Sequence, residues 1–112
     1  MRRGLVLIAL LATAQTSPQA LNQTRQAFSG CLDTLLRDSE GRRLSLEAFL
    51  ARVAATCSAE QQAFRAASIA VDLAAGNSRA DAEQSASSEI DDMQHNTLQR
   101  YQAYVETNTE PR

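Results

Sequence analysis

The sequence contains no lysine and no tryptophan, and its four glycines are isolated from one another. Isolated glycines exclude the glycine-rich loop with which many nucleotide-binding proteins hold a phosphate group. Every basic residue is an arginine and alanine is the commonest residue, which is the usage expected from a GC-rich bacterial genome. The lack of a glycine-rich run therefore excludes this class of nucleotide-binding proteins, whereas the arginine and alanine bias carries no functional information.

The chain also lacks the signals of β-structure, namely alternating apolar and polar runs, hairpin dipeptides and many β-branched residues. Helix-forming residues dominate instead, and apolar residues recur at spacings of three and four. We therefore predict an all-α fold. The 112 residues suffice for one small domain, and no internal repeat divides them.

The chain has a mildly negative net charge and no run of basic residues. From Leu21 onward there are 9 arginines against 13 aspartates and glutamates, which leaves a net charge near −4. Nucleic-acid binding needs a basic face that neutralises phosphates, and binding to an anionic membrane surface needs the same. We therefore expect neither nucleic acid nor an anionic lipid surface as a partner.

The N-terminus has the layout of a secretory signal peptide. Arg2 and Arg3 precede a uniformly apolar run from Leu5 to Leu11, and small and polar residues follow. The apolar run is much shorter than the roughly 20 residues that span a bilayer. We therefore expect export to the bacterial periplasm or to the medium, with no membrane anchor once the leader is removed.

Two cleavage sites fit this leader. Cleavage after Ala20 gives a leader of ordinary length, whereas the small residues around Thr13 favour cleavage after Ala14. With the first site, the chain divides into a signal peptide at residues 1–20, a helical domain at 21–107 and a flexible tail at 108–112.

Four helices account for the domain, at about residues 22–40, 45–57, 58–75 and 78–106. Each begins at a residue whose side chain can cap the amides of the first turn: Asn22, Ser45, Ser58 (with Gln61 as its capping-box partner) and Ser78. Gly41 and Gly76 mark two helix ends, because glycine adopts the left-handed conformation easily. A bend at Cys57 separates the second and third helices, although one continuous helix is the alternative. Short links predict a mostly antiparallel four-helix bundle.

The third helix is apolar on two sides. Phe64, Ala67 and Val71 share one side, and Ile69 and Leu73 lie largely opposite. Such a helix either lies at the centre of its domain or is partly covered by a partner. We therefore take Ile69 and Leu73 as interface candidates.

Tyr101 and Tyr104 continue the apolar stripe of the fourth helix. This placement favours the core over the alternative, an aromatic patch that contacts a partner. They remain the second pair of interface candidates.

The two cysteines, Cys31 and Cys57, lie on the stripes of the first and second helices, equidistant from Leu44 in the predicted turn. An antiparallel hairpin would bring them level, and an exported protein favours a disulfide. Closing a loop of about 27 residues stabilises a domain by about 3.5 kcal/mol in the chain-entropy model. We predict a structural disulfide; free thiols and a redox-active pair are the alternatives.

His95 is the only histidine, and it follows Asp91 and Asp92 within one helical turn. Such a group can bind a metal ion weakly. At about 100° per residue, however, all three point away from the stripe that contains Ile90 and Tyr101. We therefore expect a solvated face and assign no metal ligand and no cofactor.

The sequence presents no convergent catalytic set. No serine has a nucleophile-elbow context, and nothing places His95 beside a nucleophile. We expect a non-enzymatic exported protein that acts by protein binding or as a structural element of the bacterial envelope. Its partner would be another envelope protein or a second copy. The alternatives are a periplasmic stress chaperone, by architectural analogy, and a weak metal-binding protein centred on His95.

Overall fold

The computed structural model describes residues 17–108, and in this range it contains four helices and no strand. The helices are α1 (Pro18–Arg42), α2 (Leu46–Thr56), α3 (Ser58–Ala74) and α4 (Arg79–Asn108). The predicted small all-α bundle is therefore confirmed. Residues 1–16 of the predicted leader, and residues 109–112 of the predicted tail, lie outside the described residues.

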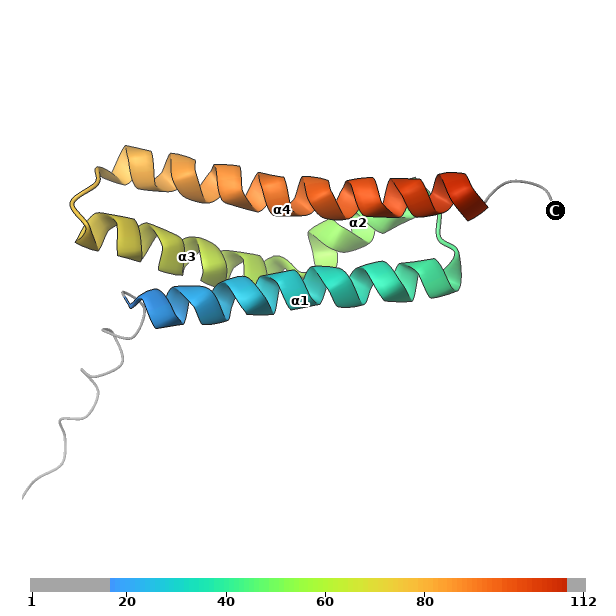
Figure 1. The fold of residues 1–112 in the computed structure, drawn as a ribbon, viewed down its shortest axis with the longest axis horizontal. Coiled ribbons are helices and arrows are strands. Elements are labelled where there is room, and N and C mark those ends of the chain that lie inside the picture. Colours follow the sequence, from blue (N-terminus) through green and yellow to red (C-terminus); the bar gives the residue numbers. More distant parts are fainter. Residues whose placement is uncertain (1–16, 109–112) are drawn as a thin grey trace, which may run out of the picture.

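The four helices are arranged as three rods. α1 and α4 run in the same direction, whereas α2 and α3 run one after the other in the opposite direction (Figure 1). Cys57 alone separates α2 from α3, so the predicted bend is confirmed. The broken rod formed by α2 and α3 contacts both α1 and α4 along its length. Each consecutive pair joined by a turn is antiparallel, as short connections require.

The start of α1 differs from the prediction. The helix begins at Pro18, inside the predicted leader, because the Ser17 hydroxyl accepts a hydrogen bond from the Ala20 amide at 3.0 Å. Proline suits the first helical position, where its missing amide hydrogen has no intrahelical partner. Asn22 therefore lies within the helix, and its side chain accepts from Arg25 instead of capping.

The predicted caps of the other helices are confirmed at two places and wrong at one. Ser45 and Ser78 each accept a hydrogen bond at 3.1 Å from the amide three residues on. At α3 the cap position is occupied by Cys57, which makes no side-chain capping bond, and Ser58 is already helical. Gln61 consequently forms no capping box, and its side chain accepts from Gln94 of α4 at 2.9 Å.

Gly41 does not end α1, which continues to Arg42. The left-handed residue is Arg43, with φ 56° and ψ 44°. The amides of Arg43 and Leu44 donate back to the carbonyls of Glu40 and Ser39, which is a Schellman-type helix end. Two tyrosines of α4 bind the same stretch of backbone, so tertiary contacts position this turn two residues beyond the glycine.

The core lies between the three rods. Phe28 of α1 stacks against Phe64 of α3 with ring centroids 6.2 Å apart, and Phe49 of α2 stacks on Tyr101 of α4 at 4.2 Å. Fully burying one such ring is worth roughly 1.5–3 kcal/mol. The members of the buried apolar cluster are Phe28, Leu32, Leu35, Leu36, Phe49, Cys57, Phe64, Ile90 and Tyr101.

Candidate functional site

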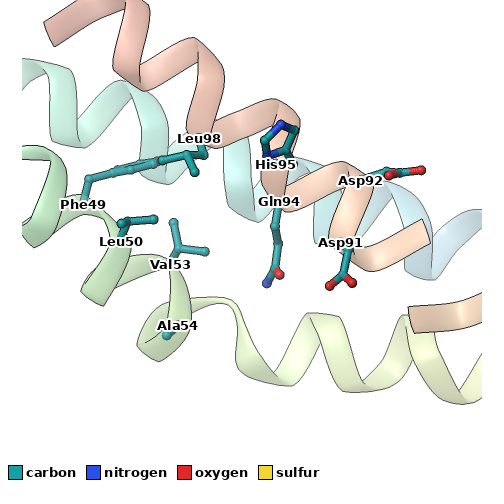
Figure 2. Close-up of a pocket in the computed structure, with 9 residues that line it drawn as sticks. All are labelled: Phe49, Leu50, Val53, Ala54, Asp91, Asp92, Gln94, His95 and Leu98. Atoms are coloured by element: carbon teal, nitrogen blue, oxygen red, sulfur yellow. The ribbon is translucent and has the colours of Figure 1, made fainter. Parts of the chain in front are cut away.

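The largest described groove lies between α2 and α4. Its volume is about 530 Å³, within the range of about 300–1,000 Å³ typical of ligand sites. Figure 2 shows its side chains, which come from one wall on α2 and one wall on α4. We call it the α2–α4 groove, and its lining residues are Phe49, Leu50, Val53, Ala54, Asp91, Asp92, Gln94, His95 and Leu98.

The groove has an apolar interior. Phe49 is fully buried, while Val53 and Leu98 are half-buried. Leu50 is 44% exposed, and it is the one large hydrophobic side chain within residues 17–108 that is exposed. Leu50 therefore adds exposed apolar surface to a concave site.

The rim of the groove is acidic. Asp91 and Asp92 are exposed on α4, and no arginine lines the groove to balance their charges. In Figure 2 the Asp91 carboxylate and the Gln94 amide extend toward the side where α3 begins, while Asp92 points elsewhere. A ligand in the groove would therefore meet an apolar interior beside the Asp91 carboxylate, while Asp92 lies on the outer side of the rim (Figure 2).

Two interactions hold α2, the first wall of the groove, against α1. Cys57, directly after α2, forms a disulfide with Cys31 of α1, and the Arg52 guanidinium donates to the Asp38 carboxylate at 2.7 Å. The buried Phe49 ring stacks on Tyr101 of α4, the helix of the other wall. The hydrogen bond from Arg52 is the largest cause that lowers the pKa of Asp38, and the positive charge of Arg42 adds to it. The wall is thus preformed.

The predicted disulfide between Cys31 and Cys57 is confirmed, with the two Cα atoms 5.9 Å apart. Both cysteines of the chain are in this bond, so the alternative of free thiols does not hold. Cys57 is buried, and Cys31 is partly exposed. Because the bond joins the middle of α1 to the bend between α2 and α3, α2 lies inside the covalently closed loop.

His95 lies on the groove rim without forming a metal site. Its imidazole and the carboxylates of Asp91 and Asp92 point in different directions in Figure 2. Within the part of the chain that the structure describes, no group of three or more histidine, cysteine, aspartate or glutamate residues could hold a metal ion. The groove lining contains no serine, threonine or cysteine that His95 could activate.

The second apolar side of α3 borders a smaller depression of about 350 Å³. Ile69 and Leu73, the predicted interface candidates, are half-buried in it, and the side chains of Arg65 and Arg79 flank them. We call this surface the α3 strip, which consists of Gln62, Arg65, Ala66, Ile69, Ala70, Leu73 and Arg79. The two-sided pattern of α3 therefore corresponds to a core side and a partly exposed side.

The other two candidates, Tyr101 and Tyr104, bind the end of α1. The Tyr101 hydroxyl donates to the carbonyls of Ser39 at 3.1 Å and Leu44 at 2.6 Å, and the Tyr104 hydroxyl donates to Glu40 at 2.8 Å. Tyr101 has no exposed surface, and burial is the main cause that raises the pKa of its phenol. Tyr101 is thus a core residue, and Tyr104 is half-buried beside it.

Sequence analysis overlooked the α2–α4 groove. Leu50 was not singled out, although it is an apolar residue that directly follows Phe49 in a helix of 11 residues. What the sequence could not supply was the identity of the neighbouring wall, which depends on the path of α4.

Comparisons with protein-family models, curated proteins and solved structures find no match to this chain. Helices α1 to α4 include none with both the length and the apolar character that crossing a bilayer requires.

Proposed function

We propose that this protein is a non-enzymatic exported binding protein of the bacterial envelope, and that its working surface is the α2–α4 groove. One observation carries the proposal: Leu50 is exposed in an apolar groove whose rim bears the Asp91 carboxylate, and no arginine lines that groove. The leader-like N-terminus and the disulfide support export, since disulfides persist in oxidising compartments. Cleavage of the leader after Ala14 is favoured over Ala20, because it leaves the Ser17 cap of α1 in the mature chain.

The shape, apolar lining and charge of the groove indicate which kind of ligand it would bind. A groove between two helices accepts the apolar face of a third helix, with leucine-like side chains spaced at three and four. Asp91 favours arginine or lysine beside those anchors, because opposite charges across an interface speed association and disfavour wrong partners. The proposed ligand is therefore a basic amphipathic helical segment of another envelope protein.

Binding accounts for the groove better than catalysis. Its titratable groups are two exposed carboxylates and one exposed imidazole, and its lining holds no nucleophilic hydroxyl or thiol. Catalytic groups need a neighbour that activates or orients them. Nothing in the lining supplies one for His95.

The test uses a short fluorescent helical peptide with leucines spaced at three and four and arginines beside them. Its matched control carries glutamates in place of the arginines. Fluorescence anisotropy with the purified protein should show binding of the arginine peptide and about tenfold weaker binding of the glutamate peptide, a difference of about 1.4 kcal/mol. Added salt should weaken the binding of the arginine peptide.

A pair of variants locates the binding. Leu50→Asp should reduce affinity for the arginine peptide at least about tenfold. Ala103→Asp adds the same charge at an exposed α4 position outside the groove and should leave affinity within about twofold. Equal binding by the Leu50 variant and the wild type, or no binding of either peptide, would refute the groove as the working surface.

A further inference from the structure

The α3 strip and the α2–α4 groove are complementary in charge. Both have apolar centres, Ile69 and Leu73 in the strip and Leu50 in the groove. The strip is flanked by two arginines, whereas the groove contains no arginine and is flanked by Asp91 (Figure 2). One molecule therefore displays both halves of a matched contact on different helices.

The two arginines of the strip have N–H donors that the described hydrogen bonds do not use. Arg65 gives one hydrogen bond to the Ser87 hydroxyl at 3.1 Å. Arg79 pairs with Glu83 at 3.3 Å, and its side chain is 64% exposed. A guanidinium carries five N–H donors, so both residues can bind a further carboxylate without losing their present partners.

We propose that the α3 strip of one molecule packs against the α2–α4 groove of a second copy. The inference deepens the proposed function and rests on it, because it names a basic, apolar helical surface of this same protein as the ligand of the groove. Leu73 and Ile69 would contact Leu50, and an arginine of the strip would face Asp91.

The contact has a consequence for assembly. The two surfaces consist of different residues, so the contact is heterologous and each bound molecule keeps one unused groove or strip. Average mass should therefore rise with concentration. Because both patches are small, the contact belongs with weak, transient interfaces rather than with obligate dimers. Its ionic component should make assembly decline as salt is added.

Light scattering after size-exclusion chromatography tests the proposal with the full purified protein. The wild type should gain average mass as its concentration rises from the micromolar to the millimolar range. Leu50→Asp, which disables the groove, and Ile69→Asp, which disables the strip, should each stay monomeric. Ala66→Asp provides a second strip variant at an exposed position, where folding is not at risk, and Ala103→Asp should assemble like the wild type.

Mixing the two disabled proteins is the decisive step. The Leu50 variant retains its strip and the Ile69 or Ala66 variant retains its groove, so the mixture should form dimers and nothing larger. A mixture that stays monomeric, or strip variants that assemble as well as the wild type, would overturn the contact. A wild type that stays monomeric while still binding the arginine peptide would overturn self-assembly and leave the proposed function intact. A wild type that neither assembles nor binds the arginine peptide would refute both proposals.

Discussion

The two ends of the bundle are built from different side chains. Where α1 turns into α2 and α4 finishes, the rings of Phe49, Tyr101 and Tyr104 lie in succession, with centroids 4.2 and 5.6 Å apart. Where α3 turns into α4, the buried residues of α4 are Ala82 and Ala86. Figure 1 shows these two turns at opposite ends, which we call the aromatic end and the alanine end.

This difference indicates that the aromatic end is held together more strongly than the alanine end. Aromatic rings remove much more apolar surface from water than alanine methyl groups do. Two of these rings also carry hydroxyls that bind the last carbonyls of α1. The aromatic end supports the floor of the α2–α4 groove through Phe49, whereas the alanine end carries the α3 strip. A rigid groove and a weakly anchored strip are therefore expected.

Removing a ring should have the largest effect. Phe49→Ala should lower the free energy of unfolding by about 3–5 kcal/mol, because it leaves a cavity against Tyr101. The matched change at the alanine end, Ala86→Gly, should cost about 1 kcal/mol through helix propensity. Chemical denaturation of both variants measures the two losses. Equal losses would contradict the contrast between the ends.

Opening the disulfide should have the next largest effect. Replacing Cys31 and Cys57 by serine should cost about 3.5 kcal/mol, because the unfolded chain regains the freedom of a loop of about 27 residues. Amide hydrogen exchange should show α2, which lies inside that loop, losing more protection than α4. The same protection loss in all four helices would show that the bond stabilises the whole fold without particular effect on the groove wall.

Removing the buried hydroxyl should cost less. Tyr101→Phe should lower the free energy of unfolding by about 1–2 kcal/mol, since the Leu44 carbonyl loses the only partner described for it. Tyr104→Phe is the control and should cost under about 1 kcal/mol, because the Glu40 carbonyl still accepts from the Arg43 amide. Thermal unfolding should rank the two, and the reverse order would contradict the described hydrogen bonds.

Alkaline pH should weaken the same end of the bundle. Because burial raises the pKa of Tyr101 in the folded protein, the neutral phenol is favoured by folding. Its contribution is complete below about pH 10, the usual pKa of tyrosine, and is lost as the pH rises through the higher folded value. Unfolding curves from pH 8 upward should show this loss, and it should shrink in the Tyr101→Phe variant. An unchanged slope in that variant would assign the effect to other groups.

The turns at the two ends should respond in opposite directions, and Arg43→Gly should have the smallest effect of all the variants. Arg43 takes the left-handed conformation at the aromatic end with φ 56°, and Gly76 does so at the alanine end with φ 97°. Arg43→Gly should raise the free energy of unfolding by about 0.5 kcal/mol, whereas Gly76→Ala should lower it by about 1–2 kcal/mol. A loss in the Arg43 variant, measured by denaturant unfolding, would reveal a role for its side chain beyond the backbone.

Helical periodicity predicted the number of helices, their order and the disulfide, because each depends on local spacing or on a symmetric hairpin. The ends of α1 were missed for two different reasons. Ser17 and Pro18 lie in a stretch that reads as part of a leader, so Asn22 was taken as the cap. The C-terminal turn at Arg43 is fixed by tyrosines more than fifty residues away, which local sequence does not reveal.

The two apolar sides of α3 were visible in its sequence and yielded Ile69 and Leu73 as interface candidates, and that role stays a prediction. The α2–α4 groove was not visible, because it requires α4 to pass beside Leu50 and to place Asp91 there. That placement depends on the packing of all three rods.

The most direct test of the working surface is a titration of the ¹⁵N-labelled protein with the leucine–arginine peptide, followed by amide chemical shifts. The account predicts that the largest changes fall in two segments, Leu50–Ala54 of α2 and Asp91–Leu98 of α4. Changes centred on the outer face of α1, or spread evenly over the four helices, would contradict it.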